Sequence, residues 1–329
     1  MHIPQTIVRV LAVLGLALSS LATLSAAEKL SLSSLFTDHA VLQRDIAVPV
    51  WCNAEPGLKV VVQFAGQEKS ATADKDGKWS VKLDPLAASA EGRALTVKAE
   101  SGSETVSRQD MLVGEVWVCS GQSNMAWTLK ASTGGDDAIA ATGDAQLRLF
   151  NAGARAGDEP QASIGGSWAV DSSQTAAGCS GVAYFFGKEL RKSLGVPVGL
   201  IKSAVGGTVA EAWTPKADLE TNPTLKPLLD QQAARLVGYP KVLEDYKQRE
   251  PELLKQYEEA LAKAKAEKKP EPRKPTAPQD PATNGNRPFG LYNGSIAPLV
   301  PYAIRGAIWY QGESNANSSR AGSSADNYG

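Results

Sequence analysis

Residues 111–125 read MLVGEVWVCSGQSNM, an apolar run that ends at Gly121 and leads into a polar turn. Such a run is typical of a buried β-strand. A strand that stops at a glycine-bearing turn can present a serine hydroxyl at the edge of a sheet. A helix that begins just after Ser123 would direct free backbone N–H groups at an oxyanion formed there. Ser123 is therefore a candidate nucleophile, although Gly-Gln-Ser-Asn alone is also typical of an ordinary polar turn.

The sequence downstream of this turn alternates between strand and helix patterns. We expect strands at 147–151, 198–204 and 303–310, a loop at 136–144, and a helix at 182–194. This alternation predicts an α/β fold with a parallel sheet and a crevice at the carboxyl ends of its strands. The predicted buried face of the helix consists of Val182, Phe185, Phe186, Leu190 and Leu194.

Two more glycine-bearing loops follow the later strands. One contains Gly206 and Gly207, and the other runs from Gln311 to Asn315. Because each loop follows its own strand, we expect both to meet the Ser123 loop in the crevice. The N–H of Ser123, a glycine N–H from Gly206 or Gly207, and an amide from Gln311 or Asn315 could then form an oxyanion hole. Loss of one such donor typically costs ~3 kcal/mol in the transition state, so the pattern predicts acyl transfer.

The N-terminal region predicts export. Residues 1–27 contain Arg9, an apolar stretch at 10–24 and a small-residue Ser-Ala-Ala ending, which is the pattern of a signal peptide cut before Glu28. The apolar stretch is short for a membrane span of ~20 residues. We therefore expect an exported protein, periplasmic or extracellular, that is not held in a membrane after cleavage.

A small antiparallel β-sandwich is predicted for residues 28–109. Strands are expected at 41–51, 59–64, 79–83 and 94–99, with a hairpin turn at 74–77 between the second and the third. This domain would pack against the next one or act as a carbohydrate-binding module. Its tryptophans, Trp51 and Trp79, would be core residues in the first case and sugar platforms in the second.

Composition excludes several classes of function. The net charge is −1, with 34 basic and 35 acidic residues, so nothing indicates a nucleic-acid partner. The three cysteines form no CxxC, and the two histidines are His2 and His39, so no metal site is predicted. Cys119 and Cys179 are expected as small buried side chains or, alternatively, as a disulfide.

A charged insertion is expected at about 219–287. Leu254, Tyr257 and Leu261 fall on one face of a helix rich in Glu, Lys and Ala, and a proline-rich stretch then follows from Pro270. The pattern predicts a solvated helical excursion followed by a stiff linker. This insertion would be peripheral or would act as a lid.

Taken together, these motifs resemble those of the sialate O-acetylesterases, which are SGNH (GDSL-like) hydrolases close to one group of acetyl xylan esterases. The resemblance implies a flavodoxin-like hydrolase domain over 110–329, no cofactor, no metal, and an acetylated sugar as substrate. It places the nucleophile on Ser123 and an acidic residue that orients the catalytic histidine on Glu313. The segments that carry it are GQSNM at 121–125, GGT at 206–208, EAW at 211–213, WYQGESN at 309–315 and LFTDHAVLQR at 35–44.

The sequence departs from this family at the catalytic histidine. The family places that histidine, three residues after an aspartate, beyond the block at 309–315, where this sequence has none. We therefore expect the hydrolase domain to be incomplete at its C-terminus and this chain to have little activity, because serine without a base is a poor nucleophile. The alternatives are a non-catalytic carbohydrate-binding module of the same fold, an acetyl xylan esterase, and an acetyl transferase. The acetylated sugar and the oligomeric state are left open.

Overall fold

A computed structural model describes residues 30–316 except residue 103. The N-terminal part forms two small sheets around a shared core. Strands β2 (Val48–Asn53) and β5 (Lys78–Leu83) pair antiparallel in one sheet, and β3 (Lys59–Phe64) lies between β4 (Gln67–Thr72) and β6 (Ser89–Ala99) in the other. This confirms the predicted antiparallel β region.

The predicted hairpin in this region is wrong. The partner of β3 across a tight turn is β4, because Ala65 and Gly66 both have positive φ angles, 49° and 78°, as a two-residue hairpin turn of matching twist requires. The turn at 74–77 instead links β4 to β5, which pairs with β2. The prediction that the two tryptophans are core residues is confirmed: Trp79 is buried, and Trp51 packs edge-on against Phe36 with ring centroids 5.1 Å apart.

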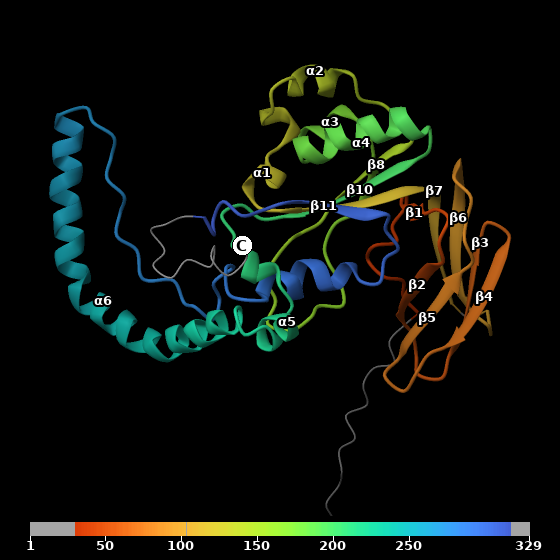
Figure 1. Ribbon diagram of the computed structural model, residues 1–329, viewed down its shortest axis with the longest axis horizontal. Coiled ribbons are helices and arrows are strands. Elements are labelled where there is room, and N and C mark those ends of the chain that lie inside the picture. Colours follow the sequence, from red (N-terminus) through yellow and green to blue (C-terminus); the bar gives the residue numbers. More distant parts are fainter. Residues whose placement is uncertain (1–29, 103, 317–329) are drawn as a thin grey trace, which may run out of the picture.

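Strand β7 (Thr105–Gly121) organises the whole molecule, because it belongs to both halves (Figure 1). Its first half pairs antiparallel with β6 and its middle pairs parallel with the short β1 (Val41–Gln43). Its second half pairs parallel with β10 (Val198–Ala204) on one side and β11 (Gly306–Tyr310) on the other. The predicted boundary at 109/110 therefore falls inside a continuous strand.

The C-terminal half of β7 belongs to a largely parallel sheet, as predicted. Beyond β10 lie β8 (Leu147–Asn151), which is parallel, and the short antiparallel β9 (Trp168–Val170) at the edge. Since β7, β8, β10 and β11 run in the same direction, their carboxyl ends lie at one edge of the sheet. The α/β fold class is confirmed.

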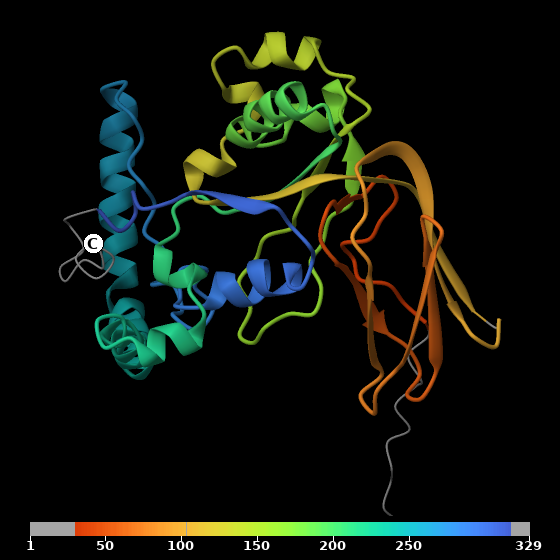
Figure 2. The same cartoon turned by 45° about the vertical axis from the view of Figure 1, so that its right-hand side comes forward.

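Helices cover one face of this sheet, and the apolar side chains between them and the sheet form a second hydrophobic core (Figure 2). They are α1 (Ser123–Ala126), the 3-10 turn η1 (Leu129–Ala131), α2 (Gly135–Ala140), α3 (Ser173–Ala177) and α4 (Gly181–Leu194). The loop expected at 136–144 is wrong in its first part, where the chain forms helix α2. Gly134, in a left-handed conformation, is the N-cap of this helix. Cys119 and Cys179 are both buried in this layer as free thiols.

The predicted helix at 182–194 is confirmed, but its predicted buried face is only partly right, since of its five residues only Phe186 and Leu190 pack against the core. Val182, Phe185 and Leu194 are exposed, and the sheet is instead covered by Ala183, Tyr184 and Gly187. A Cβ on Gly187 would lie 2.6 Å from a methyl carbon of Leu200, so the helix approaches the sheet closely enough to require a glycine there. The small residues Ala183 and Gly187 therefore decide how closely this face of the helix packs on the sheet.

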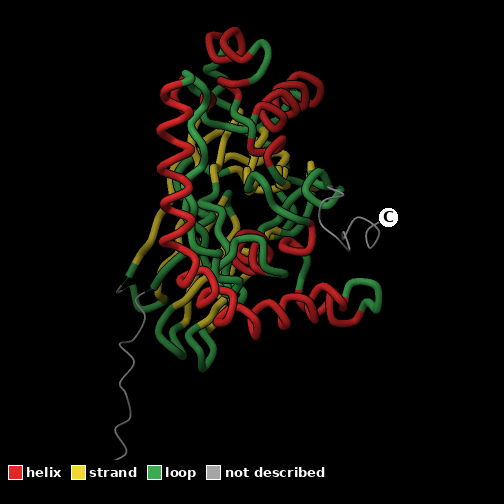
Figure 3. Tube along the Cα trace, turned by 90° about the vertical axis from the view of Figure 1, so that its left-hand side faces the viewer, coloured by secondary structure: helices red, strands yellow, loops and turns green. Residues whose placement is uncertain are grey.

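The opposite face of the sheet is covered by short helical elements and also carries the insertion. The elements are the 3-10 turn η2 (Ala210–Trp213), α5 (Lys216–Thr221), α6 (Lys226–Ala266), the π-helical turn η3 (Tyr292–Ile296) and the 3-10 turn η4 (Ala297–Leu299). Helix α6 projects from the body, and the proline-rich chain returns beside it (Figures 1 and 3). The hydroxyl of Tyr239 donates to the carbonyl of Pro278 at 3.2 Å, which ties the two segments together.

The described helices include none with the length and apolar character that a bilayer crossing would require. Even α6 is polar along its 41 residues.

Candidate active site

Ser123 lies at the carboxyl end of β7, where helix α1 begins. The chain turns there through Gly121, whose φ is 135° and where a Cβ would lie 2.0 Å from the carbonyl oxygen of Tyr310. The next N–H, from Gln122, donates to that same oxygen at 2.9 Å. This close approach of Tyr310 on β11 to Gly121 on β7 requires glycine, and the side chain of Ser123 is exposed at the sheet edge.

The loop after β10 lies directly against Ser123. The N–H of Val205 donates to the carbonyl of Gly121 at 3.1 Å. A Cβ on Gly206 would lie 3.5 Å from both Cα and Cβ of Ser123, whereas one on Gly207 would meet nothing within 4 Å. Of the two predicted glycines, Gly206 is the one the structure brings to the serine, and Gly207 supplies the left-handed turn beside it, with a φ of 73°.

The loop after β11 is joined to the Ser123 loop through Glu313. Its carboxylate accepts hydrogen bonds from the side-chain amides of Gln122 and Asn124, and Ser314 donates its hydroxyl to the Gln122 Oε1 at 2.7 Å. The hydrogen bond from Gln122 is the main cause that lowers the pKa of Glu313 below its ordinary value. Glu313 is exposed and charged near neutral pH, so it can hold these two amides and still face solvent.

The two amides predicted as oxyanion donors have different surroundings. The Asn315 side chain is buried; it accepts from the N–H of Ala210 at 2.9 Å and donates to Glu211 at 2.9 Å. The Gln311 Oε1 accepts from the N–H of Gly312 at 3.0 Å, while among the described residues its buried Nε2 has no hydrogen-bond partner. Asn315 therefore braces the loop after β10, and Gln311 is the amide left with a donor to offer.

His39 is not placed to serve Ser123. It lies in a turn rather than on a strand-like segment, with a φ of 70°, and its Nδ1 is 2.7 Å from Asp110 Oδ2. About 35 Å of β7, at ~3.3 Å per residue, separates Asp110 from Gly121. Arg148 donates to the same carboxylate oxygen at 2.7 Å. Burial acts to raise the pKa of Asp110, but the bonds from Arg148 and His39 outweigh it and the net shift is downward.

Asn286 is a residue of the site that sequence reasoning missed. Its Nδ2 donates to the carbonyl of Gly207 at 2.9 Å, and its Oδ1 accepts from the N–H of Val209 at 3.1 Å. It therefore holds both sides of the loop that carries Gly206. The sequence signal was only an Asn-Gly-Asn turn at 284–286, which gives no indication of a partner so far away along the chain.

Arginines that could recognise an acidic sugar lie at different ends of the sheet. Arg148 is buried beside Asp110, and Arg305 lies before β11 with its Nε 3.8 Å from Glu115; both are remote from the carboxyl edge. Arg155 is exposed in the chain that follows β8, where its backbone N–H donates to the Ser295 hydroxyl at 2.8 Å. Within residues 30–316, leaving out 103, no group of three or more His, Cys, Asp or Glu side chains could hold a metal ion.

A parallel α/β sheet that presents a serine between two glycine-bearing loops at its carboxyl edge has the arrangement of serine-dependent acyl-transfer enzymes. Comparison with known proteins shows what the chain is similar to. Residues 113–235 match the family described as carbohydrate esterase, sialic acid-specific acetylesterase. The chain is thus related to the sialic acid-specific acetylesterases, as the motifs predicted.

Individual relatives agree with this relation. The chain is 29% identical to the sialate O-acetylesterase of Rattus norvegicus, over 88% of this chain and 53% of the relative. It is 27% identical to the sialate O-acetylesterase of Homo sapiens, over 87% of this chain and 49% of the relative. The crystal structure of a carbohydrate acetylesterase from Xanthomonas citri matches with a TM-score of 0.65 and 33% identity, over 88% of this chain and 52% of that one. The chain spans about half the length of these relatives.

Proposed function

We propose that this chain carries the nucleophile and oxyanion loops of a carbohydrate O-acetylesterase, which removes acetyl groups from sialic acid or another acetylated sugar. The observation that carries the proposal is the meeting of Ser123, Gly206 and the loop of Gln311 and Glu313 at the carboxyl ends of three neighbouring parallel strands. The names of the relatives support the acetylated sugar as substrate.

The proposed reaction uses the Ser123 hydroxyl as nucleophile. Its oxygen attacks the acetyl carbonyl carbon, and its proton passes to a base. The backbone N–H groups of Ser123 and Gly206 and the amide of Gln311 would stabilise the oxyanion of the tetrahedral intermediate. As the intermediate collapses, the bond to the sugar oxygen breaks, that oxygen takes the proton from the base and leaves as a hydroxyl group, and Ser123 keeps the acetyl group. Water then attacks the acetyl carbonyl, releases acetate and returns the proton to Ser123 through the base.

The base is the part of this mechanism that the described residues do not supply. His39 is held at the far end of β7 by Asp110, and His2 belongs to the predicted signal peptide, outside the described residues. We propose that a histidine from outside this sequence accepts the proton of Ser123 and that Glu313 lies beside it. Without a triad member, activity falls by several orders of magnitude.

Release of 4-nitrophenol from 4-nitrophenyl acetate tests the proposal. The assay compares this chain with a longer protein that includes any downstream coding sequence, each with Ser123→Ala and with Ser193→Ala, a control at an exposed serine of α4. We expect turnover in the longer protein that Ser123→Ala abolishes and Ser193→Ala leaves unchanged. Turnover that survives Ser123→Ala would refute the role of this serine, and Ser123-dependent turnover in the present chain would refute the missing base.

We also infer that the protein is exported. The support is the basic residue, apolar stretch and small-residue ending of residues 1–27, which precede the first described strand. Mass determination of the N-terminus of the secreted protein tests this inference; a mature chain that starts at Glu28 is the expected result, and retention of residues 1–27 would contradict it.

A further inference from the structure

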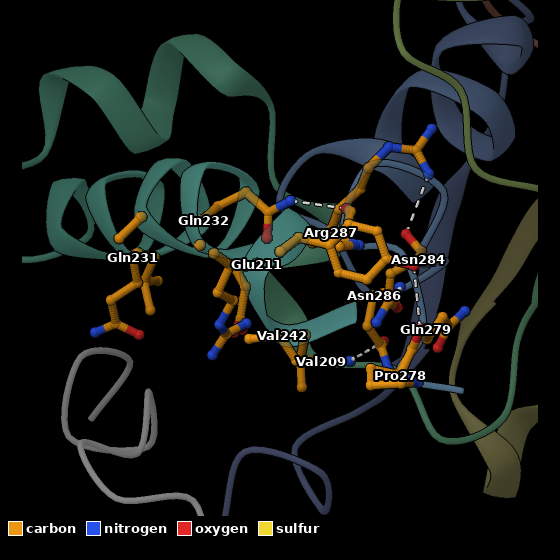
Figure 4. A pocket seen from close by; sticks show the side chains of 16 residues that line it. Val209, Glu211, Gln231, Gln232, Val242, Pro278, Gln279, Asn284, Asn286 and Arg287 are labelled. Carbon is orange, nitrogen blue, oxygen red and sulfur yellow. Dashed lines mark hydrogen bonds between the residues drawn. The ribbon is translucent and has the colours of Figure 1, made fainter. Parts of the chain in front are cut away.

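A cavity formed by described residues lies beside the candidate active site rather than at Ser123. It has a volume of about 840 Å³ and is enclosed between helix α6 and the returning chain at 278–287 (Figure 4). Such a volume is within the range of small-molecule sites. Nothing in the proposed acetyl transfer uses this cavity, so its role is a separate question.

The cavity adjoins the loop that carries Gly206. Val209 and Glu211 line it, and the same Asn286 that lines it also holds Gly207 and Val209 in place. At ~3.8 Å between consecutive Cα atoms, Val209 lies at most about 11 Å from Gly206, which in turn contacts Ser123. A ligand in the cavity would therefore occupy space next to the acetylated sugar.

The chemistry of the lining favours hydroxyl groups over ions. Side-chain amides recur around the cavity: those of Gln232 and Asn286 already bond the backbone, whereas those of Gln231 and Gln279 have no hydrogen-bond partner among the described residues, and Tyr239 adds an aromatic ring. Amides both donate and accept hydrogen bonds, as the hydroxyl groups of a sugar do. A lining that is rich in amides and includes an aromatic side chain suits a polyhydroxylated ring with one apolar face.

The charges of the lining nearly cancel. Arg287 is neutralised by Asp158, with Nη2 and Oδ1 2.8 Å apart. That leaves Glu211 and Arg235, which have opposite signs. A cavity that selected an anionic sugar would need an excess of positive charge, so the lining favours an uncharged one.

We propose that this cavity binds an uncharged sugar unit of the glycan that carries the acetyl group, one or more units away from the acetylated sugar. This inference rests on the proposed function, because it names the extended glycan as the substrate of the same site. Helix α6 and its return segment then act as one wall of the substrate site, and neither a peripheral arm nor a lid is required.

Gly238 provides a direct way to block the cavity. It lines the cavity from α6, its φ is not in the left-handed region, and a Cβ there would meet nothing within 4 Å. Gly238→Trp should therefore fill the cavity without strain in the helix. Val237→Trp is the matched control, because Val237 is the neighbouring residue, is 84% exposed and does not line the cavity. Gln231→Leu removes one amide of the lining without added bulk.

Isothermal calorimetry with Ser123→Ala as the parent protein measures binding without turnover. The probes are xylotetraose, mannotetraose and cellotetraose, which are neutral, and sialyllactose, which is anionic. We expect at least one neutral tetrasaccharide to bind, with affinity lowered about tenfold or more by Gly238→Trp, as for the loss of one or two hydrogen bonds, and unchanged by Val237→Trp. Gln231→Leu should weaken binding about threefold to tenfold. Thermal unfolding shows that each variant is folded.

Three results would overturn the proposal: no binding of any neutral tetrasaccharide, equal binding by Gly238→Trp, and binding of sialyllactose alone. The last would reassign the cavity to an anionic sugar held by Arg235. Failure of the proposed function appears separately, as 4-nitrophenyl acetate turnover that does not depend on Ser123. Binding together with no turnover by the longer protein that retains Ser123 would leave the cavity site in place and contradict only the esterase activity.

Discussion

The close approach of β11 to β7 at Gly121 can be tested by Gly121→Ala, because the structure gives the size of the effect. A non-glycine residue at a φ of 135° costs on the order of 1–3 kcal/mol. The added Cβ would also lie 2.0 Å from the Tyr310 carbonyl oxygen, so β11 must move away. That movement breaks the bond from the Gln122 N–H to this oxygen and leaves a buried donor unpaired, which costs a further ~1–3 kcal/mol.

Gly143→Ala is the matched control, because Gly143 has a similar φ of 114° but a Cβ there would meet nothing within 4 Å. Urea unfolding followed by tryptophan fluorescence should give a loss of about 1–3 kcal/mol for Gly143→Ala and about 2–6 kcal/mol for Gly121→Ala, with the larger loss in Gly121→Ala. Equal losses in the two variants would show that Tyr310 does not lie against Gly121. In that case the loop of Gln311 and Glu313 would not be fixed beside Ser123, and the candidate site would be wrong.

Three further substitutions test the site and its surroundings. Gly206→Ala places a methyl group 3.5 Å from Cβ of Ser123, which is an ordinary contact, so we expect unchanged stability to urea. In the longer, active protein we expect turnover of 4-nitrophenyl acetate to be at least about tenfold slower. Unchanged turnover would show that Gly206 does not lie beside the reacting atoms. Glu313→Gln removes the charge that two amides of the Ser123 loop bind, and it should lower turnover further than it lowers the unfolding midpoint; a loss of stability alone would make the residue structural. Asp110→Asn leaves the guanidinium of Arg148 buried without its counter-ion, at a cost of about 2–4 kcal/mol near neutral pH. The folded-state pKa of Asp110 is lowered, so the extra free energy of unfolding of the wild type over Asp110→Asn is present above about pH 4 and is lost as the pH falls through the folded-state pKa. Urea unfolding across pH should show this loss. A stability difference that does not depend on pH would contradict this ion pair.

The parallel sheet was predictable because its strands are short apolar runs between clear turn signals. Residues 147–151 and 198–204 were predicted with the bounds that the structure has, and β11 begins three residues later than expected. The order of the loops then followed from topology, since parallel strands place their carboxyl ends together. This is why the sequence alone could predict that the two later loops lie beside Ser123.

The errors share a physical cause, which is that local patterns do not identify the partner of an element. The turn at 74–77 looked like the turn of a hairpin between β3 and β5, but β3 pairs with β4, and β5 pairs with β2, which lies on the far side of β3 and β4 in the sequence. The apolar face of α4 looked buried because Val182 and Phe185 are large, yet the sheet selects the face with Gly187, where the backbone can approach. Helix α2 has no strong apolar period and is defined mainly by its glycine cap.

The position of Gly206 could not be deduced from its own neighbours in sequence, because three distant segments fix it. Val205 bonds to Gly121 on β7, Asn286 bonds to Gly207 and Val209 from the end of the insertion, and Asn315 bonds to Ala210 from the loop after β11. A backbone N–H stabilises an oxyanion only if it is already held in position when charge develops. The insertion therefore takes part in the site through Asn286, although it carries no chemistry of its own, and this contact places the wall of the amide-lined cavity next to the serine.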